Sequence, residues 1–185
     1  MSDLAREARH LTFEGAAEAP AGVRGELEGG RLVPMTRSTW RHGEIVARVT
    51  VLLGMYVKQH PGWSLSAGDP GAKLSRDPDT LRGPDVGIVR VERRPSGQGV
   101  AGWLEGAPNV AVEVVGDSQG HSELAKKALE YLAAGAKAVW VVDPEPRRVV
   151  VYTPPSSVAV LGADDELDAG DALPGFRCRV AELFE

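Results

Sequence analysis

The pattern of apolar and polar positions changes along the chain between the period of a helix and that of a strand. Apolar residues recur at the helical period from an N-cap at Ser38 or Thr39 to about residue 59, where His-Pro-Gly ends the segment, and this predicts a long helix. A second helix is predicted over residues 122–134, with Gly135 at its end. The core stripe predicted for this second helix consists of Leu124, Ala125, Ala128, Leu129 and Leu132.

Short apolar runs rich in β-branched residues predict the strands. Residues 23–35 form a predicted hairpin around Gly29-Gly30, whereas the segments 68–82 and 92–102 are predicted to be turn-rich or exposed loops. The other predicted strands are residues 63–67, 85–91, 109–115, 138–142 and 148–152, the last two joined as a hairpin. This order of elements predicts an α/β fold, a mixed central β-sheet flanked by helices.

Length and composition narrow the possible classes of protein. A chain of 185 residues predicts one main domain over residues 23–185, preceded by a peripheral segment over residues 1–22. The net charge of −5 gives no large basic field, so any contact with nucleic acid must be local. A single cysteine, Cys178, excludes an intrachain disulfide and fits a reducing cytoplasm, and no apolar stretch is long enough to predict a membrane span.

Two acidic residues stand where the apolar pattern does not favour them. Asp85 directly follows Gly83-Pro84, and Glu113 interrupts the apolar run NVAVEVV, with no other partner evident for either. A buried carboxylate needs a cation or hydrogen-bond donors, and one divalent ion would serve both if their strands are neighbours. Mg²⁺ prefers such oxygen ligands and keeps waters that a phosphate can replace, so the pair predicts metal-assisted phosphodiester hydrolysis.

A structural interpretation of the same residues stays open. Asp85 would then cap the turn at the strand entry, and Glu113 would pair with an Arg or Lys from a helix.

Lys126 and Lys127 follow on the second predicted helix, where one cation near the metal could orient water or neutralise the phosphate. The helical projection leaves both lysines eligible, although Tyr131 and Glu123, one turn away on either side, favour Lys127 slightly.

The strings PDVGIVR and PNVAVEVVGDSQGHSELAKKALEYLAAGAKAVWVVDPEPRRVVVY resemble the Uma-type putative restriction endonuclease family, a branch of the PD-(D/E)XK nuclease fold. GELEGGRLVPM and LPGFRCRVAELFE resemble its opening and closing segments, so the resemblance runs from about Val23 to the C-terminus. It implies a restriction-endonuclease-like core and an endonuclease dependent on Mg²⁺ or Mn²⁺ that acts on DNA.

The resemblance also implies roles for individual residues. Asp85 corresponds to the PD aspartate and Glu113 to the (D/E)XK acid, and the backbone carbonyl of Val114 is a candidate third metal ligand. The lysine of the motif would fall at Val115, which is apolar, and the family instead places a lysine on the following helix, where Lys127 stands.

Two further positions match the family pattern, Glu26 on the first hairpin and His42 in the first turn of the long helix. A structural histidine is the more common outcome at such a position, and the functional alternative is a side chain that approaches the phosphate or a metal-bound water. The remaining histidines lie in termini or turns and show no ligand spacing; these are His10, His60 and His121.

Two other classes of function compete with a nuclease. The chain could be an inactive nuclease-fold module that binds nucleic acid or a protein partner, which the negative net charge and Val115 favour. Trp103 and the C-terminal pair Leu183-Phe184 indicate a homo-oligomer, although such residues equally often cover the edge of a core.

Overall fold

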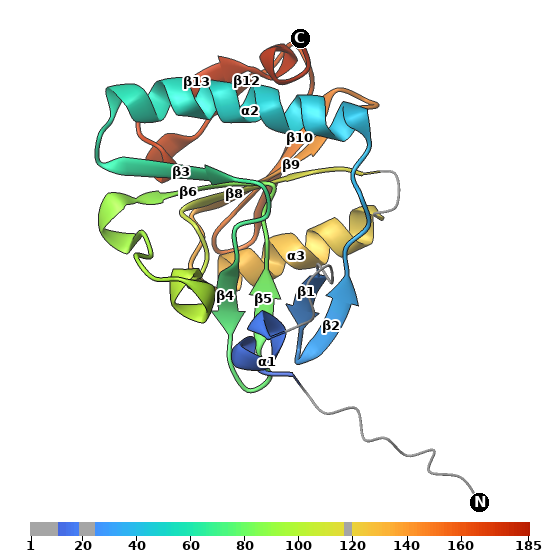
Figure 1. Cartoon of the computed structure of the whole chain (residues 1–185). Helices are drawn as coiled ribbons and strands as arrows, with labels where there is room; N and C mark the ends of the chain where they lie inside the picture. Colours follow the sequence, from blue (N-terminus) through green and yellow to red (C-terminus); the bar gives the residue numbers. More distant parts are fainter. Residues whose placement is uncertain (1–10, 19–24, 117–119) are drawn as a thin grey trace, which may run out of the picture.

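The computed structural model describes residues 11–18, 25–116 and 120–185 of the chain (Figure 1). Its helices are α1 (Phe13–Ala17), α2 (Trp40–Gln59) and α3 (His121–Ala133), with short 3₁₀ turns η1 (Val91–Arg93), η2 (Gly99–Gly102), η3 (Gly170–Ala172) and η4 (Val180–Leu183). Its strands are β1 (Gly25–Glu28), β2 (Arg31–Pro34), β3 (Trp63–Ala67), β4 (Ala72–Ser75), β5 (Thr80–Arg82), β6 (Val86–Arg90), β7 (Leu104–Glu105), β8 (Val110–Val114), β9 (Ala138–Asp143), β10 (Arg148–Thr153), β11 (Ser157–Leu161), β12 (Glu166–Asp168) and β13 (Arg177–Arg179).

A six-stranded mixed sheet forms the centre, in the order β11-β10-β9-β8-β6-β3, and only β8 and β9 are parallel neighbours. Helix α2 covers one face of this sheet and α3 the other (Figure 1). Successive side chains of a strand point to opposite faces, and β8 shows this clearly. Its valines pack into the core under α2, whereas Ala111 packs against α3, so Glu113 shares the α3 side.

A second sheet of five strands, in the order β2-β1-β5-β4-β7, lies on the α3 side of the molecule (Figure 1). The chain crosses between the two sheets at Gly83–Pro84–Asp85, which joins β5 to β6. Residues 35–39 link β2 of the five-stranded sheet to α2. A Cβ at Gly83 would lie 3.0 Å from the Cβ and the carbonyl oxygen of Asp69, so the β5–β6 crossing packs closely against that residue.

The structure confirms the predicted fold class and the main elements. The long helix starts after Thr39, whose side chain accepts a hydrogen bond from the His42 N–H, and it ends at Gln59. The predicted hairpin is β1 and β2, and its turn glycines have φ of 54° and 81°, which favours glycine at both positions. Helix α1 lies within the N-terminal segment 1–22; residues 1–10 and 19–24 lie outside the described residues.

Several local predictions were wrong. The segment 68–82 contains β4 and β5 as well as turns, and β11, β12 and β13 follow the hairpin that was predicted to be the last element. Leu129 is 54% exposed instead of lying in the core stripe of α3. The Leu183-Phe184 pair is buried in the core under α2, so it offers no surface to a second copy. Trp103 is half-buried, with its ring edge against Phe13.

No helix within the described ranges is both long and apolar enough to span a bilayer.

Candidate active site

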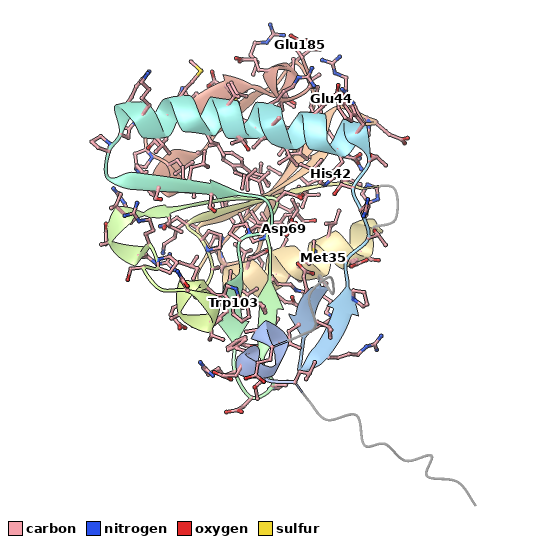
Figure 2. The ribbon with its side chains drawn as sticks, in the orientation of Figure 1. Met35, His42, Glu44, Asp69, Trp103 and Glu185 are labelled. Carbon is pink, nitrogen blue, oxygen red and sulfur yellow. The ribbon has the colours of Figure 1, made fainter. Side chains whose placement is uncertain are left out.

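A cleft of about 490 Å³ opens where the two sheets meet. The β5–β6 crossing and the link from β2 to α2 line it, together with the start of α3 and the end of β8. Figure 2 shows three of the lining residues, Met35, His42 and Asp69, between α2 and the five-stranded sheet. Five acidic side chains face two basic ones in this lining, and the charged residues are Glu26, Asp69, Asp85, Glu113, Glu123, Arg37 and Lys127.

Asp85 and Glu113 meet in this cleft because their strands are neighbours. Strands β6 and β8 are antiparallel, and Val86 pairs with Val112, so the residue before β6 lies opposite Glu113. The Asp85 carboxylate accepts a hydrogen bond from the Val114 N–H at 2.7 Å. The geometry thus brings together the two carboxylates that the sequence singled out.

Glu113 lies in an almost closed environment, with only 3% of the residue exposed. Its Oε1 accepts a hydrogen bond from the Tyr131 hydroxyl at 2.8 Å, and its Oε2 is 3.8 Å from Lys127 Nζ. Burial raises the pKa of Glu113 to about 8; the charges of Asp85 and Glu26 add to the rise, and Lys127 opposes it. Glu113 is therefore held as a neutral acid near pH 7 until a further positive charge reaches it.

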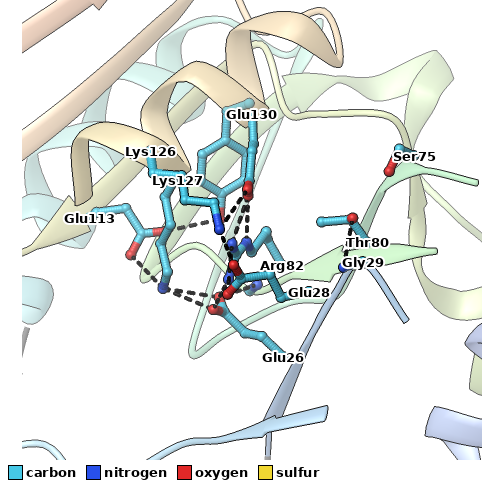
Figure 3. A network of polar contacts seen from close by, with 12 residues as sticks. Glu26, Glu28, Gly29, Ser75, Thr80, Arg82, Glu113, Lys126, Lys127 and Glu130 are labelled. Carbon is cyan, nitrogen blue, oxygen red and sulfur yellow. Dashed lines mark hydrogen bonds and ion pairs between the residues drawn. The ribbon is translucent and has the colours of Figure 1, made fainter. Parts of the chain in front are cut away.

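Lys127 lies buried between two carboxylates from different sheets (Figure 3). Its Nζ is 3.0 Å from Glu26 Oε2 on β1 and 3.8 Å from Glu113 Oε2 on β8. Burial by itself would lower the pKa of Lys127, but the charges of Glu113 and Glu26 outweigh it and raise the pKa. The lysine therefore stays protonated and gives the cleft a fixed positive charge.

Glu26 holds Lys127 in place and is itself held by Arg82. The Arg82 guanidinium is 2.8 Å from Glu26 Oε2 and 2.7 Å from Glu130, and the Gly83 N–H donates to Glu26 Oε1 at 3.1 Å. Glu26 thus belongs to the charge network around Lys127, and its contacts are those of a positioning residue.

Lys126, the other lysine considered, lies outside this arrangement. Its side chain is 54% exposed and pairs with Glu28 and Glu130 at the surface. Of the two lysines, only Lys127 lines the cleft. The structure thus distinguishes them where the helical projection could not.

His42 completes the surroundings of Asp85. Its Nε2 lies 3.3 Å from Asp85 Oδ2, and the residue is 9% exposed in the first turn of α2. The hydrogen bond to Asp85 raises the pKa of His42, against the effect of burial, and the Asp85 charge adds to the rise. His42 is therefore buried and paired with a carboxylate, as a structural histidine would be, and it also lines the cleft beside Asp85.

The structure corrects the expectation that neither carboxylate has a partner within the protein. Asp85 accepts a hydrogen bond from Val114 and pairs with His42. Glu113 accepts a hydrogen bond from Tyr131 and pairs with Lys127, so the lysine from a helix that the structural interpretation requires is also present. Sequence reasoning missed Arg82, which it placed in a turn-rich segment, and gave Tyr131 a packing role only. A fully buried arginine in a three-residue strand carries no periodic signal that could have revealed it.

Comparisons with known proteins give the family and a similar fold. A family model described as "Uma2: Putative restriction endonuclease" matches residues 11–181. The chain belongs to this family. It also resembles the crystal structure of a protein from Anabaena variabilis ATCC 29413 described as a putative nuclease of DUF820, with a TM-score of 0.82 and 18% identity over 94% of this chain and 97% of that one. No curated protein matches the chain.

The cleft of this Uma2 member offers oxygen donors of the kind that a hard divalent cation prefers. Glu26 and Asp85 carry negative charge beside Glu113, and this charge is among the causes of the raised pKa of Glu113. Once Glu113 loses its proton, these three acids outnumber the two cations among them, Arg82 and Lys127. Within the described residues no three His, Cys, Asp or Glu side chains are grouped to hold an ion. The candidate ligand set is therefore two carboxylates and a backbone carbonyl, with water for the remaining positions.

The contact between His42 and Asp85 predicts a titration result in the metal-free protein. Changing Asp85 to asparagine removes a hydrogen bond and a charge that favour protonated His42 and leaves burial, which opposes it. The pKa of His42, which lies above its ordinary value in the wild type, should therefore fall in this variant. An NMR titration of the imidazole in both proteins measures this, with exposed His121 as the internal reference. An unchanged pKa in the Asp85→Asn variant would contradict the assigned contact.

Proposed function

We propose that this protein is an endonuclease that hydrolyses phosphodiester bonds of DNA with the help of Mg²⁺ or Mn²⁺. The observation that carries the proposal is the convergence of Asp85, Glu113 and buried Lys127 in one cleft, although their elements are distant in the sequence. Membership of a family whose model is described as "Putative restriction endonuclease" supports the same reaction class.

In this proposal Asp85, Glu113 and the carbonyl oxygen of Val114 hold the divalent ion. Bound there, such an ion supplies a more acidic water and a positive charge against the phosphate. The Val114 N–H fixes the Asp85 carboxylate, and the Tyr131 hydroxyl fixes the Glu113 carboxylate. Both side chains are thus oriented before the substrate arrives, which lowers the cost of reorganisation.

Lys127 supplies the second positive charge. Its ammonium is held by Glu26 at 3.0 Å and, because it is buried, is poorly screened by water. We infer that it orients the attacking water or stabilises the negative charge that develops on the phosphate. Lys127 would thus take the role of the lysine that the (D/E)XK motif has at the position of Val115.

A pH dependence of metal binding follows from the state of Glu113. Because its pKa is about 8 without metal, Glu113 must lose a proton when a cation binds below that pH. The affinity for Mn²⁺ should therefore increase as the pH rises from 6 to 8 and level off above, and each binding event at pH 7 should release close to one proton. Calorimetric titrations in buffers of different ionisation enthalpy measure both. Proton release that persists in the Glu113→Gln variant would show that another group is its source.

A cleavage assay tests the proposed function. Wild-type protein is incubated with supercoiled plasmid and with linear duplex DNA in Mg²⁺, Mn²⁺ or EDTA, and Glu113→Gln serves as the inactive control. Cleavage that requires the metal and Glu113 supports the proposal. DNA binding without metal-dependent cleavage of either substrate would instead support an inactive nuclease-fold module, the alternative that Val115 favours.

A further inference from the structure

An arginine-rich segment borders the cleft in an otherwise acidic protein. Residues 31–41, with the sequence RLVPMTRSTWR, contain three arginines and no acidic residue, whereas the whole chain has a net charge of −5. The segment runs from the start of β2 to the second residue of α2 (Figure 1). It is thus the kind of local basic surface that a protein of negative net charge needs in order to hold a polyanion.

This segment forms one wall of the cleft. Residues 33–39 all line it, together with Glu123 and Lys127 of α3. Arg37 is exposed at this wall and forms no ion pair with a carboxylate in the described part of the chain. Arg41 is half-exposed and has only a surface contact of 3.6 Å with Glu44. Both guanidinium groups are therefore available to phosphates of a strand that enters the cleft.

Trp40, the residue between this wall and Arg41, is the most exposed large apolar side chain of the described residues, at 86%. By contrast, Trp63 and Trp140 are 6% and 1% exposed. On a helix Trp40 points to nearly the opposite side from His42, so its ring stands outside the cleft at the rim and away from Asp85. A strand that leaves the cleft along the arginine-rich wall passes this ring.

We infer that Trp40 stacks on an unpaired base of a single-stranded DNA segment whose phosphates contact Arg37 and Arg41. In duplex DNA the faces of the bases are covered by their neighbours, so a free indole ring can stack only where a base is unstacked. Aromatic rings beside a positively charged groove are the usual means of binding single strands. This inference rests on the proposed function and adds a substrate class to it, DNA that is single-stranded next to the bond cleaved.

Binding rather than cleavage tests the inference. The anisotropy of a labelled single-stranded oligonucleotide, and of the blunt duplex of the same sequence, is measured against wild type and Trp40→Ala in EDTA at low salt. Wild type should prefer the single strand, and Trp40→Ala should weaken that complex by roughly tenfold or more, the usual effect of losing one stacked base. Trp40→Phe should retain most of the affinity. Val51→Ala, on the exposed face of the same helix but distant from the rim, is the matched control and should bind like wild type.

A second readout separates stacking from general destabilisation. The single strand should quench tryptophan fluorescence in wild type and not in Trp40→Phe. Arg37→Ala should reduce affinity and flatten its dependence on salt by about one counterion, whereas Lys58→Ala, at the far end of α2, should do neither. The inference would be overturned if wild type and Trp40→Ala bound the single strand equally well. It would also be overturned if wild type bound the duplex as tightly as the single strand.

The same measurements distinguish a failure of this inference from a failure of the proposed function. Trp40-dependent binding by a protein that cleaves nothing would retain the single-strand site and refute the nuclease. Metal-dependent cleavage by a protein whose binding ignores Trp40 would retain the nuclease and refute the site.

Discussion

Changing Lys127 to methionine is expected to lower the rate of DNA cleavage by about 10²-fold or more, the usual loss when one preorganised electrostatic group is removed from an active site. Methionine matches the length of the lysine stem, so the buried volume stays filled. Glu26 keeps Arg82 and the Gly83 N–H as partners, and Glu113 keeps Tyr131, so no carboxylate is left without a hydrogen bond. The rate is measured at saturating Mn²⁺, so that a change in metal affinity does not limit it.

The neighbouring lysine provides the control for this prediction. Lys126 is on the same helix but exposed, where it pairs with Glu28 and Glu130. Surface pairs of this kind contribute little, so Lys126→Met should cleave at the wild-type rate and unfold at a similar temperature. Equal rates for the Lys127→Met variant and wild type would remove Lys127 from the mechanism, provided that thermal unfolding shows both proteins folded.

Changing Glu113 to glutamine should have two opposite effects. Metal-dependent cleavage should fall by at least about 10²-fold, because a metal ligand and its charge are lost. The metal-free protein should nevertheless become more stable near pH 8. The pKa of folded Glu113, about 8, lies above the unfolded value of 4.5, so wild type binds the extra proton when folded and loses stability as the pH rises through this window. Glutamine has no such proton to lose.

Denaturant unfolding in EDTA at pH 5 and pH 8 measures the second effect. The free energy of unfolding of Glu113→Gln minus that of wild type should be larger at pH 8 than at pH 5. Glu123→Gln, which alters an exposed carboxylate of the same cleft, should show neither the pH-dependent gain nor the loss of cleavage. If the difference is the same at both pH values, the raised pKa of Glu113 is wrong.

The sequence predicted the long elements of the fold because their patterns are local. Helix α2 repeats its buried positions over twenty residues, and β8 and β9 are nearly uninterrupted apolar runs. Strands β4, β5 and β7 are two to four residues long, too short for a period to show. Leu129 satisfied the helical pattern of α3 yet is exposed, because Lys127 and Tyr131 instead take positions on its buried side.

The sequence could reveal only those site residues whose charge conflicts with the apolar residues next to them in the chain. Asp85 directly precedes one apolar strand and Glu113 interrupts another, and that conflict is visible in the sequence. The network that holds Lys127 is not visible in this way, because Glu26 stands 101 positions earlier in the chain, on a strand of the five-stranded sheet. The choice between Lys126 and Lys127 came from the family resemblance, and the structure supplies its physical reason in the burial of Lys127.

Anomalous diffraction from crystals grown at pH 8 with saturating Mn²⁺ tests whether Asp85 and Glu113 share one divalent ion. We expect a manganese peak bounded by both carboxylates and the Val114 carbonyl oxygen, at ligand distances of roughly 2.1 Å as for small hard cations. The peak should be absent from crystals of Glu113→Gln grown in the same way. A wild-type cleft with no manganese between Asp85 and Glu113 would contradict the account.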